Sequence, residues 1–132
     1  MKTDLFDAAK AARENSYSPY SQCRVGAAVR TVGGQVYAGC NVENASYGAT
    51  VCAERVAIQK AVSEGHVKIR EVMVVTDATP PWAPCGMCRQ VIAEFGEDVQ
   101  VHMANLKGEA KTVSFRDLFP NAMTPEQVFK KS

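Results

Sequence analysis

The chain has 132 residues, of which 46% are hydrophobic and 22% charged, a composition that is typical of a folded globular protein and excludes a disordered one. Its 15 Lys and Arg nearly balance 14 Asp and Glu, which leaves a net charge of +1. Without a basic excess to neutralise a phosphate backbone, we expect no nucleic-acid partner. The length suits a single domain over residues 1–132.

The predicted elements follow from hydrophobic periodicity and from the glycines and prolines that interrupt it. In chain order they are a helix over residues 4–15, strands over 25–31 and 35–42, a helix over 50–64, a strand over 71–76, a helix over 85–95, strands over 99–103 and 110–113, a helix over 115–119 and a turn begun by Pro125. The apolar run 71–76 is typical of a central strand covered on both faces. This order predicts an α/β fold, a three-layer α/β/α sandwich with a five-stranded mixed sheet.

The sequence shows no segment suited to a membrane or to secretion. No stretch of about 18 apolar residues occurs, and residues 1–4 lack the apolar run of a signal peptide. We therefore expect a cytoplasmic protein without a membrane partner. In that reducing compartment the five cysteines favour metal or redox chemistry over a disulfide framework.

Three cysteines have the spacing of a metal site. Cys85 and Cys88 form a Cys-x-x-Cys pair, which can bind one metal ion through both sulfurs, and Cys52 begins another predicted helix. A helix N-terminus favours the thiolate form of a cysteine. Three protein ligands leave zinc one open position, which is typical of catalytic rather than structural zinc. We predict one Zn²⁺ per chain.

Charged neighbours of these cysteines complete the predicted chemistry. Glu54 is two residues from Cys52, so its carboxylate can reach the open position as a proton acceptor and donor without being a ligand. Three thiolates on Zn²⁺ leave a negative net charge that weakens the metal as a Lewis acid. Arg55 and Arg89 directly follow the cysteine motifs and are predicted to donate hydrogen bonds to the sulfurs.

The combination of these motifs resembles a known family. Cys52-Ala53-Glu54 followed by Pro84-Cys85-x-x-Cys88 matches the zinc deaminase signature in its three-cysteine form. Further matching segments are residues 17–21, 25–29, 39–47 and 84–90. From about residue 17 to 120 the chain resembles the small, homotetrameric cytidine deaminases of the cytidine/deoxycytidylate deaminase family.

The resemblance implies hydrolysis of cytidine and deoxycytidine to the uridine nucleosides and ammonia. Water activated by zinc would attack C4, while Glu54 protonates ring N3 and then the departing amine. The substrate contacts that it implies are Asn41 and Glu43 on the ribose 3′-hydroxyl, the Ala53 N–H on the pyrimidine O2, the Ala83 carbonyl on the exocyclic amine, and Ala45 and Tyr47 supplied by a neighbouring chain. It also implies a homotetramer with shared active sites.

Two positions depart from the family pattern. Cys23 stands where the family usually has a phenylalanine against the pyrimidine, and Met123 where a neighbour's phenylalanine covers the base. These departures affect base recognition rather than the zinc chemistry. They leave an alternative substrate open, a cytosine nucleoside antibiotic of the blasticidin S type or another modified cytosine nucleoside.

Two alternatives come from outside the deaminase class. Cys85-Gly86-Met87-Cys88 is also compatible with a redox dithiol, although that interpretation gives Cys52 and Glu54 no role. A structural zinc would need a fourth ligand, for which the candidates are Cys23, Cys40, His66 and His102. His102 alternates with apolar residues in a predicted strand, so we expect it to be half-exposed.

Overall fold

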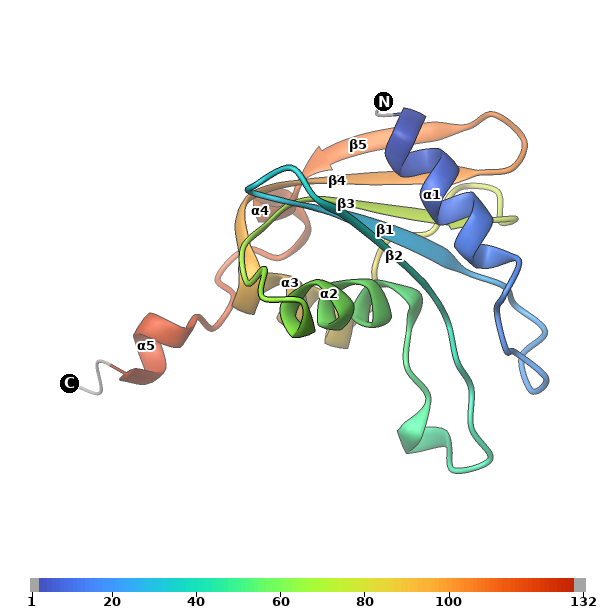
Figure 1. Cartoon of the computed structure of the whole chain (residues 1–132), viewed down its shortest axis with the longest axis horizontal. Coiled ribbons are helices and arrows are strands. Elements are labelled where there is room, and N and C mark those ends of the chain that lie inside the picture. Colours follow the sequence, from blue (N-terminus) through green and yellow to red (C-terminus); the bar gives the residue numbers. More distant parts are fainter. Residues whose placement is uncertain (1–2, 130–132) are drawn as a thin grey trace.

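A computed structural model of the chain describes residues 3–129. Its centre is a five-stranded sheet in the order β2-β1-β3-β4-β5 (Figure 1). The strands are β1 (Gly26–Thr31), β2 (Val36–Cys40), β3 (Ile69–Thr76), β4 (Gly96–Asn105) and β5 (Ala110–Ser114). β3 and β4 pair in parallel and every other neighbouring pair is antiparallel, so the sheet is mixed, as predicted.

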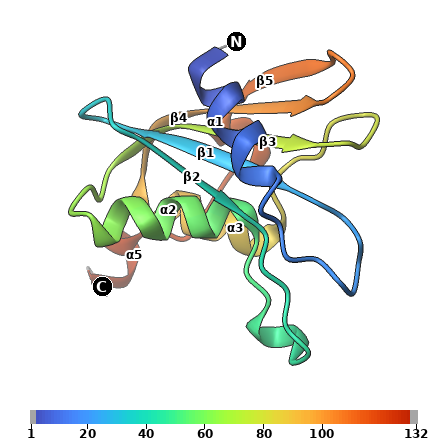
Figure 2. The same cartoon turned by 45° about the vertical axis from the view of Figure 1, so that its right-hand side comes forward.

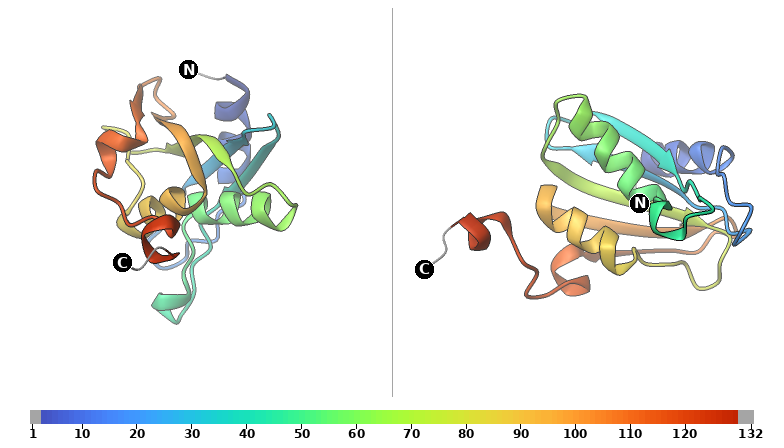
Figure 3. Two further views of the ribbon diagram at one scale, coloured as in Figure 1. Left: turned by 90° about the vertical axis from the view of Figure 1, so that its left-hand side faces the viewer. Right: turned by 90° about the horizontal axis from the view of Figure 1, so that it is seen from below.

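Helices cover both faces of this sheet. They are α1 (Thr3–Arg13), α2 (Ala53–Ser63), α3 (Gly86–Phe95), α4 (Phe115–Leu118) and α5 (Pro125–Phe129), with a short 3₁₀ helix, η1, at Tyr47–Ala49. α1 lies on one face, and α2 and α3 lie on the other (Figures 1 and 3). The three-layer α/β/α prediction is therefore confirmed. No helix within residues 3–129 is long and apolar enough to span a membrane.

β3 is the strand around which the core is built. Successive side chains of a strand point to opposite faces. Met73 and Val75 accordingly pack in the cluster under α1, whereas Val72 and Val74 pack in the larger cluster under α2 and α3. These four side chains are at most 2% exposed, which confirms β3 as a strand covered on both faces.

α2 begins later than the sequence pattern indicates, at Ala53 rather than near residue 50. The reason is a backbone pairing: Val42 and Val51 exchange two N–H···O hydrogen bonds of 2.9 Å and form an antiparallel bridge. This bridge keeps the chain extended up to Cys52, which becomes the N-cap of α2. Between Val42 and Val51 the chain projects from the sheet and carries η1 near its tip (Figure 2).

His102 is buried, which corrects the expectation of a half-exposed side chain. It is 5% exposed, with Nε2 2.9 Å from Glu71 Oε2 and Nδ1 2.8 Å from Thr112 Oγ1. The other Glu71 oxygen accepts a 2.9 Å hydrogen bond from Arg30. Because both ring nitrogens have partners on neighbouring strands, burial of this polar side chain costs little.

Candidate metal centre and substrate pocket

The three predicted ligands converge where α2 and α3 begin. Cys52 and Cys85 are the N-caps of α2 and α3, and Cys88 is in the first turn of α3. Their sulfurs lie within 4.8 Å of one another, with Cys52–Cys85 at 3.6 Å and Cys85–Cys88 at 3.4 Å. Tetrahedral zinc with Zn–S bonds of about 2.3 Å needs sulfurs about 3.8 Å apart, so the donor set fits zinc.

The cluster has three protein ligands rather than four. Among residues 3–129 it contains no histidine or carboxylate, and neither Cys23 nor Cys40 belongs to it. The fourth ligand required by the structural-zinc alternative is therefore not found in the described part of the chain. This arrangement matches the open coordination position of a catalytic zinc site.

The surroundings of the sulfurs favour a thiolate. Hydrogen bonds from Cys88, then Arg55 and Cys85, lower the pKa of Cys52 to about 5, although burial opposes the shift. The pKa of Cys88 is raised, because its hydrogen bond to Cys52 and its burial both favour its protonated form. One negative charge is therefore already stabilised in the cluster by the protein itself.

Glu54 lies beside the sulfurs in the first turn of α2. It is 4% exposed, and this burial, followed by the negative charge of Cys52, raises its pKa to about 7. A carboxyl group with a pKa near neutrality can both accept and return a proton at physiological pH. The geometry therefore suits the role predicted for Glu54.

The two predicted arginines differ in what they contact. Arg55 Nη2 lies 3.8 Å from Cys52 Sγ and 3.2 Å from the Thr50 carbonyl, while its buried Nε has no hydrogen-bond partner among residues 3–129. Arg89 instead donates to two carbonyls, those of Pro84 at 2.8 Å and Leu118 at 2.9 Å. Arg55 is thus placed to neutralise thiolate charge, whereas the contacts of Arg89 hold the loop before α3 against the end of α4.

A cavity of about 330 Å³ adjoins the metal cluster, at the lower end of the size range of small-molecule sites. It is lined by Ser21, Cys23, Val25, Asn41, Glu43, Thr50, Cys52, Ala53, Glu54, Val74, Trp82, Ala83 and Cys85. The structure thus brings five of the predicted substrate-binding residues together with Glu54 and two metal ligands. Sequence reasoning gave no role to Ser21, Thr50 or Val74.

Asn41 and Glu43 are two polar residues that line this cavity. The Asn41 side-chain oxygen accepts hydrogen bonds from the Val25 N–H at 3.0 Å and from the Ser16 hydroxyl, and its amide nitrogen donates to the Cys23 carbonyl at 2.8 Å. Glu43 accepts from neighbouring donors, and the Ser21 hydroxyl above all lowers the pKa of its carboxyl group. Glu43 therefore presents a carboxylate at neutral pH.

Three predicted residues lie outside the cavity of their own chain: Ala45, Tyr47 and Met123. Ala45 is exposed on the projecting segment. Tyr47 is 76% exposed and lines an adjoining hollow of about 390 Å³, with its ring 5.9 Å from that of Tyr20. Met123 is 62% exposed, and its carbonyl accepts a hydrogen bond from Gln90. Within one chain, none of the three borders the cavity that holds Glu54.

A three-cysteine cluster that fits zinc and leaves it an open position, beside a buried carboxyl group and a small-molecule cavity, defines a zinc-dependent hydrolytic enzyme. Residues 1–103 match the family model described as the cytidine and deoxycytidylate deaminase zinc-binding region. The chain therefore belongs to the cytidine and deoxycytidylate deaminase family, as its motifs indicated.

Individual relatives agree with this assignment. The chain is 45% identical to a cytidine deaminase of Sporosarcina psychrophila over 94% of this chain and 92% of the relative. It is 47% identical to that of Halalkalibacterium halodurans over 89% of each. The crystal structure of cytidine deaminase from Burkholderia pseudomallei superposes with a TM-score of 0.88 at 45% identity, covering 93% of this chain and 99% of that structure.

Proposed function

We propose that the protein catalyses the hydrolysis of cytidine and deoxycytidine to uridine and deoxyuridine with release of ammonia. The observation that carries this proposal is the buried Glu54 carboxyl group beside a cluster of three cysteine sulfurs, in a cavity that Asn41 and Glu43 also line. The relatives described above are named cytidine deaminases, which supports the same substrates.

The reaction divides between the metal and the residues of this chain. Cys52, Cys85 and Cys88 would hold a zinc ion, which when bound supplies Lewis acidity and lowers the pKa of water to about 7. Glu54 accepts one proton from the attacking water and delivers it to ring N3. It then takes the second proton of the same oxygen, as the C4 carbonyl forms, and gives it to the amine, which leaves as ammonia. Arg55 offsets the thiolate charge that would otherwise reduce this acidity.

The remaining cavity residues bind and orient the nucleoside in this proposal. Asn41 has an N–H to donate and Glu43 can only accept, so together they suit a hydroxyl group, here the ribose 3′-hydroxyl. The Ala53 N–H is assigned to the pyrimidine O2 and the Ala83 carbonyl to the exocyclic amine. Both residues line the cavity next to the metal ligands, which supports this orientation of the base.

The antibiotic alternative is not favoured. The matched relatives carry the name cytidine deaminase, at about 45% identity over most of the chain. The Cys23 and Met123 departures then modify the wall around an ordinary pyrimidine nucleoside, rather than indicating a different substrate.

We also propose a homotetramer in which neighbouring chains share active sites. Ala45, Tyr47 and Met123 support this assembly, because they are exposed and do not border the cavity of their own chain. A cytoplasmic location is part of the same proposal. None of the five cysteines forms a disulfide, and cysteines stay reduced in such a compartment.

The test is ammonia release from cytidine and deoxycytidine by protein of measured zinc content, with the Glu54→Ala variant as the control. We expect the variant to retain zinc and to lose activity by a factor of about 10² to 10⁴, the usual contribution of a general acid–base group. Full activity in folded, zinc-free protein, or in Glu54→Ala, would overturn the mechanism.

A further inference from the structure

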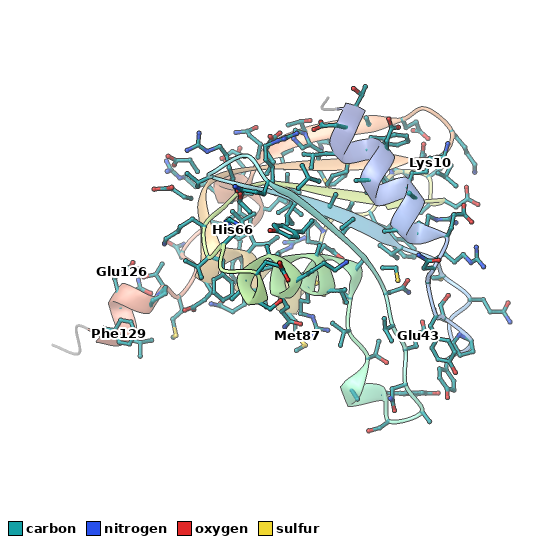
Figure 4. The ribbon with its side chains drawn as sticks, in the orientation of Figure 1. Lys10, Glu43, His66, Met87, Glu126 and Phe129 are labelled. Carbon is teal, nitrogen blue, oxygen red and sulfur yellow. The ribbon has the colours of Figure 1, made fainter. Side chains whose placement is uncertain are left out.

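The segment before β1 is bound tightly to the segment after β2. The Tyr17 N–H donates to the Asn41 carbonyl at 3.1 Å, and the Glu43 N–H donates to the Tyr17 carbonyl at 2.8 Å. A turn then follows in which Gln22 has φ 59° and donates its N–H to the Ser18 carbonyl at 2.9 Å. This turn directs two successive N–H groups and one hydroxyl toward the Glu43 side chain, which is labelled in Figure 4.

The three donors divide unequally between the two carboxylate oxygens of Glu43. Oε1 accepts the N–H groups of Tyr20 at 2.9 Å and Ser21 at 3.1 Å, which occupy both of its lone pairs. Among the donors of residues 3–129, Oε2 accepts only the Ser21 hydroxyl, so one of its lone pairs stays available. No ion pair involves Glu43 within residues 3–129, so no cation takes that position.

The direction of the Ser21 hydrogen bond follows from its partners. The Cys23 N–H donates to Ser21 Oγ at 3.0 Å, so the serine oxygen acts as an acceptor on that side. A carboxylate has no proton to give, so the single hydroxyl proton of Ser21 must go to Glu43 Oε2. Ser21 thereby determines which lone pair of Oε2 remains for a ligand in the cavity, which both residues line.

We propose that Ser21 is a positioning residue that orients Glu43 to accept a hydrogen bond from the 3′-hydroxyl group of the nucleoside sugar. This inference rests on the proposed function. The hydrogen bonds of the Ser21 side chain within residues 3–129 join it to Glu43 and Cys23 and to none of the predicted metal ligands, so its effect should fall on binding of the sugar rather than on the chemical step.

The experiment compares wild type, Ser21→Ala and Ser21→Thr on cytidine, 2′-deoxycytidine and 3′-deoxycytidine. Ser21→Ala should raise KM for the first two by about tenfold, the loss typical of one hydrogen bond to a charged group, with a much smaller change in kcat. It should leave KM for 3′-deoxycytidine unchanged. If 3′-deoxycytidine is turned over too slowly for KM to be measured, its Ki as an inhibitor of cytidine deamination is measured instead and should also be unchanged. Ser21→Thr keeps the hydroxyl and should restore binding.

A double-mutant cycle with Glu43→Gln tests whether Ser21 acts through the carboxylate. If it does, adding Ser21→Ala to Glu43→Gln should raise KM for cytidine much less than tenfold. Ser63→Ala is the matched control, because the exposed Ser63 hydroxyl donates to the Lys60 carbonyl at the end of α2, far from the cavity lining. Zinc content and thermal unfolding are measured on every variant.

Failure of this inference is distinguishable from failure of the proposed function. Wild type that releases no ammonia from any of the three nucleosides would contradict the proposed function. Active wild type whose Ser21→Ala variant keeps its KM, or loses as much binding of 3′-deoxycytidine as of cytidine, would overturn the role of Ser21 alone.

Discussion

At the scale of single residues, Arg55 is the positive charge that can offset the negative charge of the metal-binding thiolates. Three thiolates on a divalent cation leave a net charge near −1, which opposes the acidity that a catalytic zinc must have. The Arg55 guanidinium lies 3.8 Å from Cys52 Sγ. Although burial opposes the shift, its hydrogen bond to Cys52, followed by the negative charge of Cys52, raises the pKa of Arg55. Arg89 does not share this task, because its described hydrogen bonds go to backbone carbonyls.

We therefore expect Arg55→Gln to lower kcat for cytidine by about 10- to 100-fold, the usual effect of removing a partner of a metal ligand. Zinc should also leave the variant faster in the presence of a chelator. Kinetics and metal analysis on the same preparations measure both effects. Arg70→Gln, at an exposed position of β3, is the control and should match wild type. An Arg55→Gln variant with unchanged kcat would refute this role.

At the scale of single residues, Cys23 is the position in the cavity wall that departs from the phenylalanine expected from the family pattern. It is exposed and lines the cavity beside Val25 and Trp82, so a larger side chain there can contact a bound base. An aromatic face adds about 0.5–1.5 kcal/mol beyond the area that it buries. We expect Cys23→Phe to lower KM for cytidine about two- to tenfold. Cys23→Ala controls for loss of the thiol, and equal KM values in all three proteins would place Cys23 outside the base-binding surface.

At the scale of elements, the sequence predicts those features that depend on short-range spacing of residues. The Cys-x-x-Cys pair, Glu54 two residues after Cys52, and the apolar run in β3 are short-range patterns, and the structure contains each of them. The start of α2 depends on the bridge between Val42 and Val51, and the orientation of Glu43 depends on Ser21. Val42 and Val51 are 9 positions apart in the sequence, and Ser21 and Glu43 are 22 apart. Both contacts are formed by the tertiary fold, so hydrophobic periodicity does not predict them.

Gly39 lies where β2 packs against α2, the helix that carries Glu54 and is capped by Cys52. β2 passes so close to α2 that a Cβ at Gly39 would lie 2.7 Å from Val56 Cγ1 and 2.8 Å from the Ala57 nitrogen. Relief of this overlap requires α2 to shift, so Gly39→Ala should lower the free energy of unfolding by about 1–3 kcal/mol. Denaturant unfolding measures the change. Gly48→Ala, whose added Cβ meets nothing within 4 Å, should be neutral. Equal stability of the two variants would show that the contact between β2 and α2 is not tight.

At the scale of the whole molecule, the C-terminal helix α5 exposes apolar side chains that no other part of the described chain covers. α5 projects from the body in Figure 1, and Phe129, labelled in Figure 4, is 83% exposed. Large exposed apolar side chains that gather on one segment mark a contact surface. No residue of α5 borders the cavity of its own chain. Direct contact of α5 with a bound substrate would therefore have to occur in the cavity of a second chain.

The Phe129→Ser variant tests whether α5 contacts a neighbouring copy of the chain, because Phe129 lies outside the cavity of its own chain. If α5 packs on a neighbouring copy, the variant should dissociate at higher protein concentration than wild type, and its kcat/KM should fall in parallel as the proposed assembly is diluted. Light scattering measures the mass, and activity is followed on the same dilution series at equal zinc content. Val32→Ser is the control, since Val32 is an exposed valine of the turn between β1 and β2. Loss of activity at unchanged mass would exclude α5 as the contact, and a wild type that is monomeric and fully active would exclude shared active sites altogether.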